Sequence, residues 1–151
     1  MAKLPTLSNV LAYNNTAVIQ RFKQNHPKDS TRAELLFTDM LRYLWLCEKH
    51  WWDCKNNPNE PKLNFIPVMH EEMRAIDNMW HEFILLTRDY HDFCHSFFGR
   101  FLHHEPNMRS TLAYSPSEFT NSLNLFLNYI YDNLGEDILI AWFKEHLEEV
   151  A

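Results

Sequence analysis

Glycine is scarce in this sequence, and this scarcity restricts the folds that the chain can adopt. Only two glycines, Gly99 and Gly135, occur among 151 residues. A β-sandwich or β-barrel normally uses many glycines in tight turns and bulges. Hydrophobic residues make up 46% of the chain and recur at intervals of three and four, the spacing of a helix face. We therefore expect an all-α fold in which residues 1–151 form a single-domain bundle of about five helices.

Helix start signals divide the N-terminal half. Residues 1–15 are expected to form an irregular lead-in or a short helix, and Asn15 or Thr16 then caps the first full helix. A capping box of Thr31 and Glu34 predicts the start of the second helix. This helix ends where prolines interrupt the chain, in KNNPNEPK.

The C-terminal half shows three further helical segments. Apolar residues step by three or four from Val68 to Gly99, which predicts one long helix that ends or bends at the glycine. Ser115 opens a second capping box, and Gly135 is expected to be the left-handed C-cap of that helix. The last helix covers about 136–149, with acidic residues at its positive end.

The overall charge argues against two classes of partner. The formal charge is −6 and the pI is about 5.8, without a run of basic residues, so neither nucleic acid nor an anionic membrane is expected as a partner. The first residues lack the apolar run of a signal peptide, and no stretch is long enough to span a membrane. We expect a cytoplasmic protein whose cysteines are reduced thiols.

Histidines are concentrated in the centre of the chain, and they indicate where chemistry is located. Of nine histidines, only His26 and His146 lie outside the interval between residues 50 and 104. On one continuous helix, His70, Asp77 and His81 fall within about 40° of one another. Asp77 and His81, four residues apart, are neighbours that can bind a metal ion together or act as a catalytic pair. In the second case, the carboxylate orients the imidazole as a general base. A helix-supporting surface contact is the third interpretation of the same spacing.

The adjacent His103 and His104 follow Gly99, where a bend in the chain can bring one of them back toward Asp77 and His81. Two imidazoles and one carboxylate suit zinc or non-haem iron. We therefore predict a divalent metal ion with Asp77, His81 and one of the two later histidines as ligands, and His70 in reserve.

Two cysteine–histidine groups are alternatives. One helix face carries Cys47, His50 and Cys54, which are soft-metal ligands. His91 lies three residues before Cys94, as in a Cys–His nucleophile pair. Both groups compete with a simple packing role, because free cysteine often behaves as a small hydrophobic residue.

The central stretch AIDNMWHEFILLTRDYHDFCHSFFGRFLHHEP resembles a known family. The family consists of small bacterial proteins related to the N-terminal region of plant glycine-rich domain proteins. The resemblance covers about residues 63–106. The shared positions are Asp77, Trp80, His81, Thr87, Tyr90, Cys94, Phe98, Gly99, His103, His104 and Pro106.

The resemblance implies a functional core but no particular activity. It places Asp77, Trp80, His81 and the pair of His103 and His104 in that core. The plant proteins have a second histidine in a Trp-His-x-His version of the motif, and Phe83 stands at that position here. The role of that second histidine therefore does not transfer.

Two hypotheses about function follow. The first is a metal-dependent protein, with an enzyme activity left open, that acts on a small molecule or a protein. The second is a protein-binding or adaptor module without chemistry, whose histidines support packing or respond to pH. The sequence does not indicate an oligomeric state.

Overall fold

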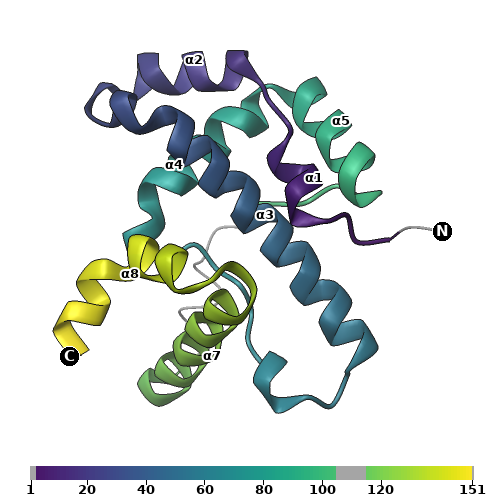
Figure 1. The fold of residues 1–151 in the computed structure, drawn as a ribbon, viewed down its shortest axis with the longest axis vertical. Helices are drawn as coiled ribbons and strands as arrows, with labels where there is room; N and C mark the ends of the chain where they lie inside the picture. The colour runs from purple at the N-terminus through teal and green to yellow at the C-terminus, as the bar shows by residue number, and fades with distance from the viewer. Residues whose placement is uncertain (1–2, 105–114, 151) are drawn as a thin grey trace. The chain divides into compact units, whose positions relative to one another are not determined.

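The computed structural model describes residues 3–104 and 115–150, and every regular element in these ranges is helical. This confirms the all-α prediction, although the described residues hold seven α-helices, more than the five expected. Short 3-10 helices connect some of them: η1 (Pro27–Arg32), η2 (Pro61–Leu63) and η3 (Glu71–Met73). The α-helices are α1 (Leu7–Leu11), α2 (Thr16–Asn25), α3 (Ala33–Asn56), α4 (Arg74–Leu85), α5 (Thr87–Phe98), α7 (Pro116–Leu134) and α8 (Glu136–Val150) (Figure 1).

Contacts along the chain define two compact units, which we describe separately. The first consists of Met1–Glu48 and Arg74–His103, and the second of Lys49–Met73 and His104–Ala151. Helix α3 supplies residues to both units. The expectation of a single domain stays a prediction.

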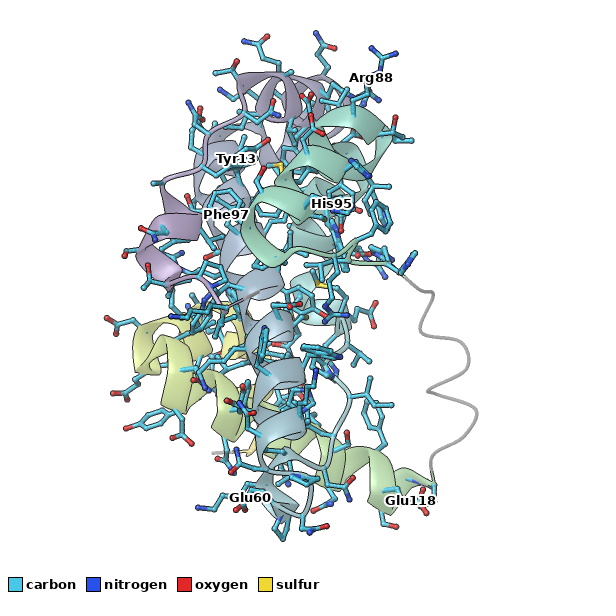
Figure 2. The ribbon with its side chains drawn as sticks, turned by 90° about the vertical axis from the view of Figure 1, so that its right-hand side faces the viewer. Tyr13, Glu60, Arg88, His95, Phe97 and Glu118 are labelled. Carbon is cyan, nitrogen blue, oxygen red and sulfur yellow. The ribbon has the colours of Figure 1, made fainter. Side chains whose placement is uncertain are left out.

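An aromatic cluster forms the core of the first unit, in which α2 packs against α4 and α4 packs against α5. Phe83 of α4 contacts Tyr90 and Phe93 of α5, with ring centroids 5.0 and 5.2 Å apart. Tyr13, in the segment before α2, contacts Phe97 with a centroid separation of 6.0 Å (Figure 2). Phe83, Tyr90 and Phe93 are almost fully buried, so each stabilises the unit by about 1.5–3 kcal/mol.

The long helix predicted between Val68 and Gly99 is wrong. The structure has η3, α4 and α5 in its place, with a non-helical backbone at Leu86 (φ −85°, ψ 71°). On a straight helix, residues 83 and 93 would lie about 15 Å apart along the axis. Their ring centroids are 5.2 Å apart, because α5 turns back against α4. An apolar stripe with a period of three and four fits both arrangements, so periodicity does not locate the break.

The predicted helix caps have mixed outcomes. Ser115 accepts a hydrogen bond from the backbone N–H of Glu118, as predicted. Thr31 lies inside η1 and α3 begins at Ala33, so Thr31 is not the cap of that helix. The Glu34 carboxylate accepts a hydrogen bond from Lys23 instead. Gly135 has a positive φ of 93°, but its ψ of 167° lies outside the predicted left-handed helical region.

The core of the second unit lies where α7 packs against α8 and η2, and α8 packs against η3. Phe65, Phe126 and Phe143 are buried there. Phe143 has non-helical angles (φ −127°, ψ 29°), which kink α8. Residues 105–114, which include the motif position Pro106, lie outside the described residues.

No helix in the described part of the chain is long and apolar enough to cross a membrane.

Candidate metal centre

Asp77 and His81 lie one turn apart on α4, as predicted from their spacing. Asp77 is in the first turn of the helix, where the exposed backbone N–H groups favour a carboxylate. The Oδ2 atom of Asp77 is 3.5 Å from Nε2 of His81, and 52% of the His81 side chain is exposed. A carboxylate and an accessible imidazole thus face the same small volume of solvent.

His104 completes a three-residue group with this pair. Asp77, His81 and His104 each offer one ligand atom, and these atoms all lie within 4.8 Å of one another. In residues 3–104 and 115–150, this is the one group of three or more histidine, cysteine, aspartate or glutamate side chains with such geometry. His103 is the last residue of the first unit, and His104 follows it directly in the chain.

Hydrogen bonds from Tyr90 hold the segment that leads to His104. The Tyr90 hydroxyl accepts a hydrogen bond from Nε1 of Trp80 on α4, at 3.0 Å. The same hydroxyl donates to the backbone carbonyl of Leu102, at 2.5 Å. Because Trp80, Tyr90 and Leu102 are all buried, these bonds are protected from water and tie the segment to α4 and α5.

An ion pair between the partly exposed Arg100 and the buried Glu48 holds the same segment at its start. Gly99 ends α5 in the left-handed conformation (φ 70°, ψ 7°), which a glycine adopts without steric strain. Arg100, the next residue, donates to both oxygens of the Glu48 carboxylate, with its shortest contact at 2.8 Å. Glu48 is only 1% exposed, so this carboxylate depends on Arg100 for compensation of its charge.

The distances in the group are close to those of a metal site. Ligand atoms about 2.0–2.1 Å from a tetrahedral zinc ion lie about 3.3 Å from each other. The 3.5 Å separation between Asp77 and His81 nearly matches this value. Side-chain rotations that move ligand atoms by about 1.5 Å bring atoms at the 4.8 Å limit into range. The chemistry of two imidazoles and one carboxylate therefore fits zinc or iron.

The other two predicted ligands lie elsewhere. His70 precedes η3 in non-helical backbone, so the helix-face argument that grouped it with Asp77 is wrong. In the second unit its ring stacks on Phe126 at 5.5 Å, and burial lowers the pKa of His70 to about 4, with a further contribution from His146. The His103 ring contacts the Phe101 ring at 4.8 Å. Neither residue belongs to the three-residue group.

Cys94 has the environment of a core residue rather than of a nucleophile. Its side chain is fully buried. Burial is the main reason that the pKa of the Cys94 thiol is raised, which disfavours the reactive thiolate. Burial likewise raises the pKa of Cys47 to about 12. These shifts favour the packing interpretation over Cys–His catalysis.

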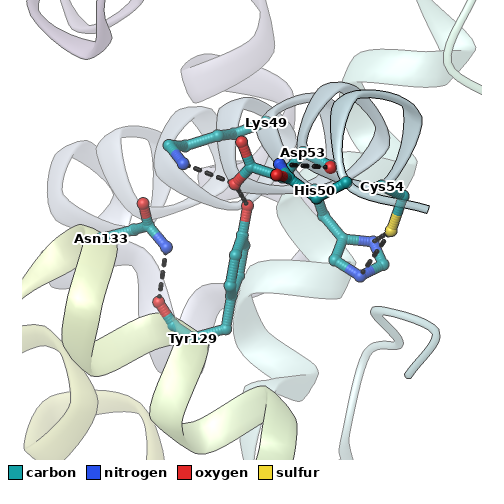
Figure 3. A network of polar contacts seen from close by, with 7 residues as sticks. Lys49, His50, Asp53, Cys54, Tyr129 and Asn133 are labelled. Carbon is teal, nitrogen blue, oxygen red and sulfur yellow. Dashed lines mark hydrogen bonds and ion pairs between the residues drawn. The ribbon is translucent and has the colours of Figure 1, made fainter. Parts of the chain in front are cut away.

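A polar network in the second unit contains the other cysteine–histidine pair (Figure 3). The Asp53 carboxylate accepts hydrogen bonds from Lys49 and from the Tyr129 hydroxyl, both at 2.6 Å. Nε2 of His50 lies 2.9 Å from the Leu63 carbonyl, which identifies it as the protonated ring nitrogen, since a carbonyl only accepts.

Cys54 lies 3.4 Å from the same nitrogen of His50. Burial raises the pKa of the Cys54 thiol and lowers the pKa of the His50 imidazole, so both groups favour their neutral forms. The contact of His50 with Leu63 joins α3 to the η2 segment, and the hydrogen bond from Tyr129 to Asp53 joins α3 to α7. The network therefore has a structural explanation.

The comparisons with known proteins give one match. A family model described as UCP032817-like matches residues 65–129, a segment that contains Asp77, His81 and His104. This description names no activity. No curated protein and no solved structure matches the chain. The match is a similarity between this segment and that family, and the relation to plant glycine-rich domain proteins stays a prediction.

Sequence reasoning missed the partners that hold the site. Tyr90 is one of the positions shared with the resembling family, and this was the sequence feature that could have indicated a role beyond packing. Glu48 and Arg100 carried no such signal, because 52 residues separate them.

Proposed function

We propose that Asp77, His81 and His104 hold one divalent metal ion, zinc or iron, and that this chain is a metal-dependent protein. The observation that supports the proposal is the placement of their three ligand atoms within 4.8 Å of one another. The third ligand, His104, lies at the end of a segment that Glu48 and Tyr90 anchor through hydrogen bonds. Such anchoring reduces the entropy that a ligand loses on binding metal.

Three protein ligands leave room for further ligands on the ion. Structural zinc sites are normally closed by four protein ligands, whereas catalytic sites keep a position for water or substrate. His81 is about half exposed, so a small molecule can reach that side of the group. A bound ion there would lower the pKa of a coordinated water and polarise a substrate oxygen.

A metal-free acid–base pair is the second candidate. It is favoured by the 3.5 Å distance between Nε2 of His81 and Oδ2 of Asp77, in which the carboxylate orients the ring. This candidate does not use His104. A substitution of His104 should therefore impair the metal site and leave the acid–base pair intact.

Calorimetric titration of metal-free protein with zinc tests the proposal. Wild type should bind one equivalent, and Asp77→Asn, His81→Gln and His104→Gln should each weaken binding by at least about tenfold. His91→Gln is the matched control, since His91 is also an exposed imidazole one turn from a potential ligand, His95. Equal affinity in wild type and His104→Gln would contradict the three-ligand site.

A titration with a second ion distinguishes iron from zinc and a metal site from the metal-free alternatives. Anaerobic titration with ferrous iron should show the same dependence on the three residues if iron is the ion. Absence of saturable binding of either ion would leave the acid–base pair or an adaptor role. Loss of binding in His91→Gln alone would instead assign the ion to α5.

A further inference from the structure

The first unit contains a second candidate binding site, a cavity between α5 and the segment that precedes α2. Its volume is about 340 Å³, within the range of small-ligand pockets. The lining residues are Tyr13, Asn15, Asp89, Asp92, Phe93, Ser96 and Phe97. Aromatic rings and carboxylates thus line one cavity that is open to solvent.

Three aromatic rings form the walls at steep angles. The Tyr13 ring lies 4.8 Å from Phe93 at 57° and 6.0 Å from Phe97 at 86°. The three rings are therefore not a parallel stack, and all of them line the cavity. Figure 2 shows Tyr13 and Phe97 on the same side of α5. The faces of such rings attract a positive charge, because their quadrupole is negative there.

Two carboxylates give the cavity a negative charge. Asp89 accepts a hydrogen bond from Asn15, and Asp92 lies 3.6 Å from the ring of its neighbour His91. In the described part of the chain, neither aspartate forms an ion pair with lysine or arginine. Figure 2 shows the adjacent Arg88 directed away from Tyr13 and Phe97.

Asn15 orders the rim of the cavity. Its amide group donates to the Tyr13 hydroxyl at 3.0 Å and to Asp89 at 2.9 Å, and its carbonyl caps α2 through Val18. The positions of the phenol and of one carboxylate are thereby coupled. Burial, followed by the charges of Asp89 and Asp92, raises the pKa of Tyr13 despite this hydrogen bond. Tyr13 therefore stays a neutral ring beside an anionic rim.

We propose that this cavity binds a compact organic ammonium cation, with its head group against Tyr13 and Phe97 and its charge balanced by Asp89 and Asp92. An alkylammonium ion uses both the rings and the carboxylates. A hard metal ion needs six or more oxygen ligands and gains little from aromatic walls. A neutral apolar molecule would leave the two carboxylates without a counter-charge.

Choline and its uncharged carbon analogue 3,3-dimethylbutan-1-ol are the probes, because the two have the same shape and differ in charge. Titrations followed by nuclear magnetic resonance should show choline shifting the signals of Tyr13, Asp89 and Phe97, while the alcohol leaves them unchanged. Added salt should weaken choline binding, since the rim is exposed. The metal-site variant His81→Gln should bind choline as wild type does.

Variants test the two components of the cavity. Asp89→Asn with Asp92→Asn should weaken choline binding at least about tenfold, and Phe97→Leu about threefold to tenfold. Asp132→Asn, an exposed aspartate in the second unit, and Phe119→Leu, a partly exposed phenylalanine, are the matched controls. Circular dichroism checks that each variant stays folded.

Three results would overturn the proposal. They are equal binding of choline and the neutral alcohol, unchanged choline affinity in the double aspartate variant, and no signal change at millimolar choline. Equal binding of choline and the neutral alcohol would show that the cavity binds apolar groups without preference for a positive charge.

Discussion

The hydroxyl group of Tyr90 donates a hydrogen bond to the carbonyl oxygen of Leu102, two residues before His104. The same hydroxyl accepts a bond from Trp80, which lies between Asp77 and His81 in the sequence of α4. One buried phenol therefore connects the helix that carries two candidate ligands to the segment that carries the third. Through this connection, a residue outside the three-residue group can control the position of His104.

Tyr90→Phe tests this connection with little change in volume. The variant keeps the ring but leaves the Leu102 carbonyl and the Trp80 N–H without their partner, so we expect a loss of about 1–3 kcal/mol in the free energy of unfolding. Zinc affinity should also fall by about tenfold to a hundredfold, as for residues that orient metal ligands. Denaturant titration and zinc calorimetry measure the two effects.

Tyr131→Phe is the control for Tyr90→Phe, because the Tyr131 side chain is 53% exposed. Its stability should change by less than about 0.5 kcal/mol. If Tyr90→Phe were destabilised but bound zinc with wild-type affinity, Tyr90 would have a packing role only.

The two glycines should differ in their response to substitution. Gly99 has left-handed helical angles, which alanine adopts at a cost of about 1–2 kcal/mol. Gly135 combines a φ of 93° with a ψ of 167°, a region essentially confined to glycine, so alanine there should cost about 2–3 kcal/mol. A Cβ at Gly135 would meet nothing within 4 Å, so the cost is backbone strain. Thermal and denaturant unfolding provide the comparison.

Asparagine provides a check on this explanation, since it tolerates the left-handed helical region better than alanine. Gly99→Asn should recover part of the stability lost in Gly99→Ala. Gly135→Asn should recover little. Equal recovery at both positions would contradict the conformational argument.

His70 should make the stability of the protein depend on pH. Burial lowers its pKa to about 4 in the folded state, below its ordinary value of 6.5. As the pH falls from 6.5 toward 4, the unfolded chain takes up a proton that folded His70 does not, so the free energy of unfolding decreases. We expect a loss of about 2 kcal/mol from this residue, with partial exposure reducing the full effect.

His70→Gln isolates this contribution, because glutamine does not titrate. Between pH 7.5 and 4.5, the variant should lose about 2 kcal/mol less stability than wild type, measured by denaturant unfolding. If the free energy of unfolding changed with pH in the same way for wild type and His70→Gln, burial would not lower the pKa of His70.

Local geometry explains what could be predicted from the sequence. The contact between Asp77 and His81 follows from helix spacing alone, so it needed only the correct assignment of a helix there. The caps at Asn15 and Ser115 are local in the same sense, since each side chain bonds a backbone N–H three residues later. Two glycines and a persistent apolar period were enough to indicate an all-α fold.

Tertiary packing determines what the sequence did not indicate. The break at Leu86 has neither proline nor glycine to mark it, and the driving contacts are those of Phe83 with residues of α5. The choice between His103 and His104 depends on how Tyr90 and Arg100 hold the intervening chain. The cavity beside Tyr13 brings together residues about 80 positions apart. A local sequence pattern does not indicate contacts between residues so far apart in the chain.

The metal content of protein purified without a histidine tag is the most direct test of the metal site. Inductively coupled plasma mass spectrometry should find about one zinc or iron ion per wild-type chain, and much less than one in His81→Gln and His104→Gln. His91→Gln should keep the wild-type content. Wild-type protein that contains no stoichiometric metal, and whose melting temperature is unchanged by added zinc or ferrous iron, would contradict the metal centre at Asp77, His81 and His104.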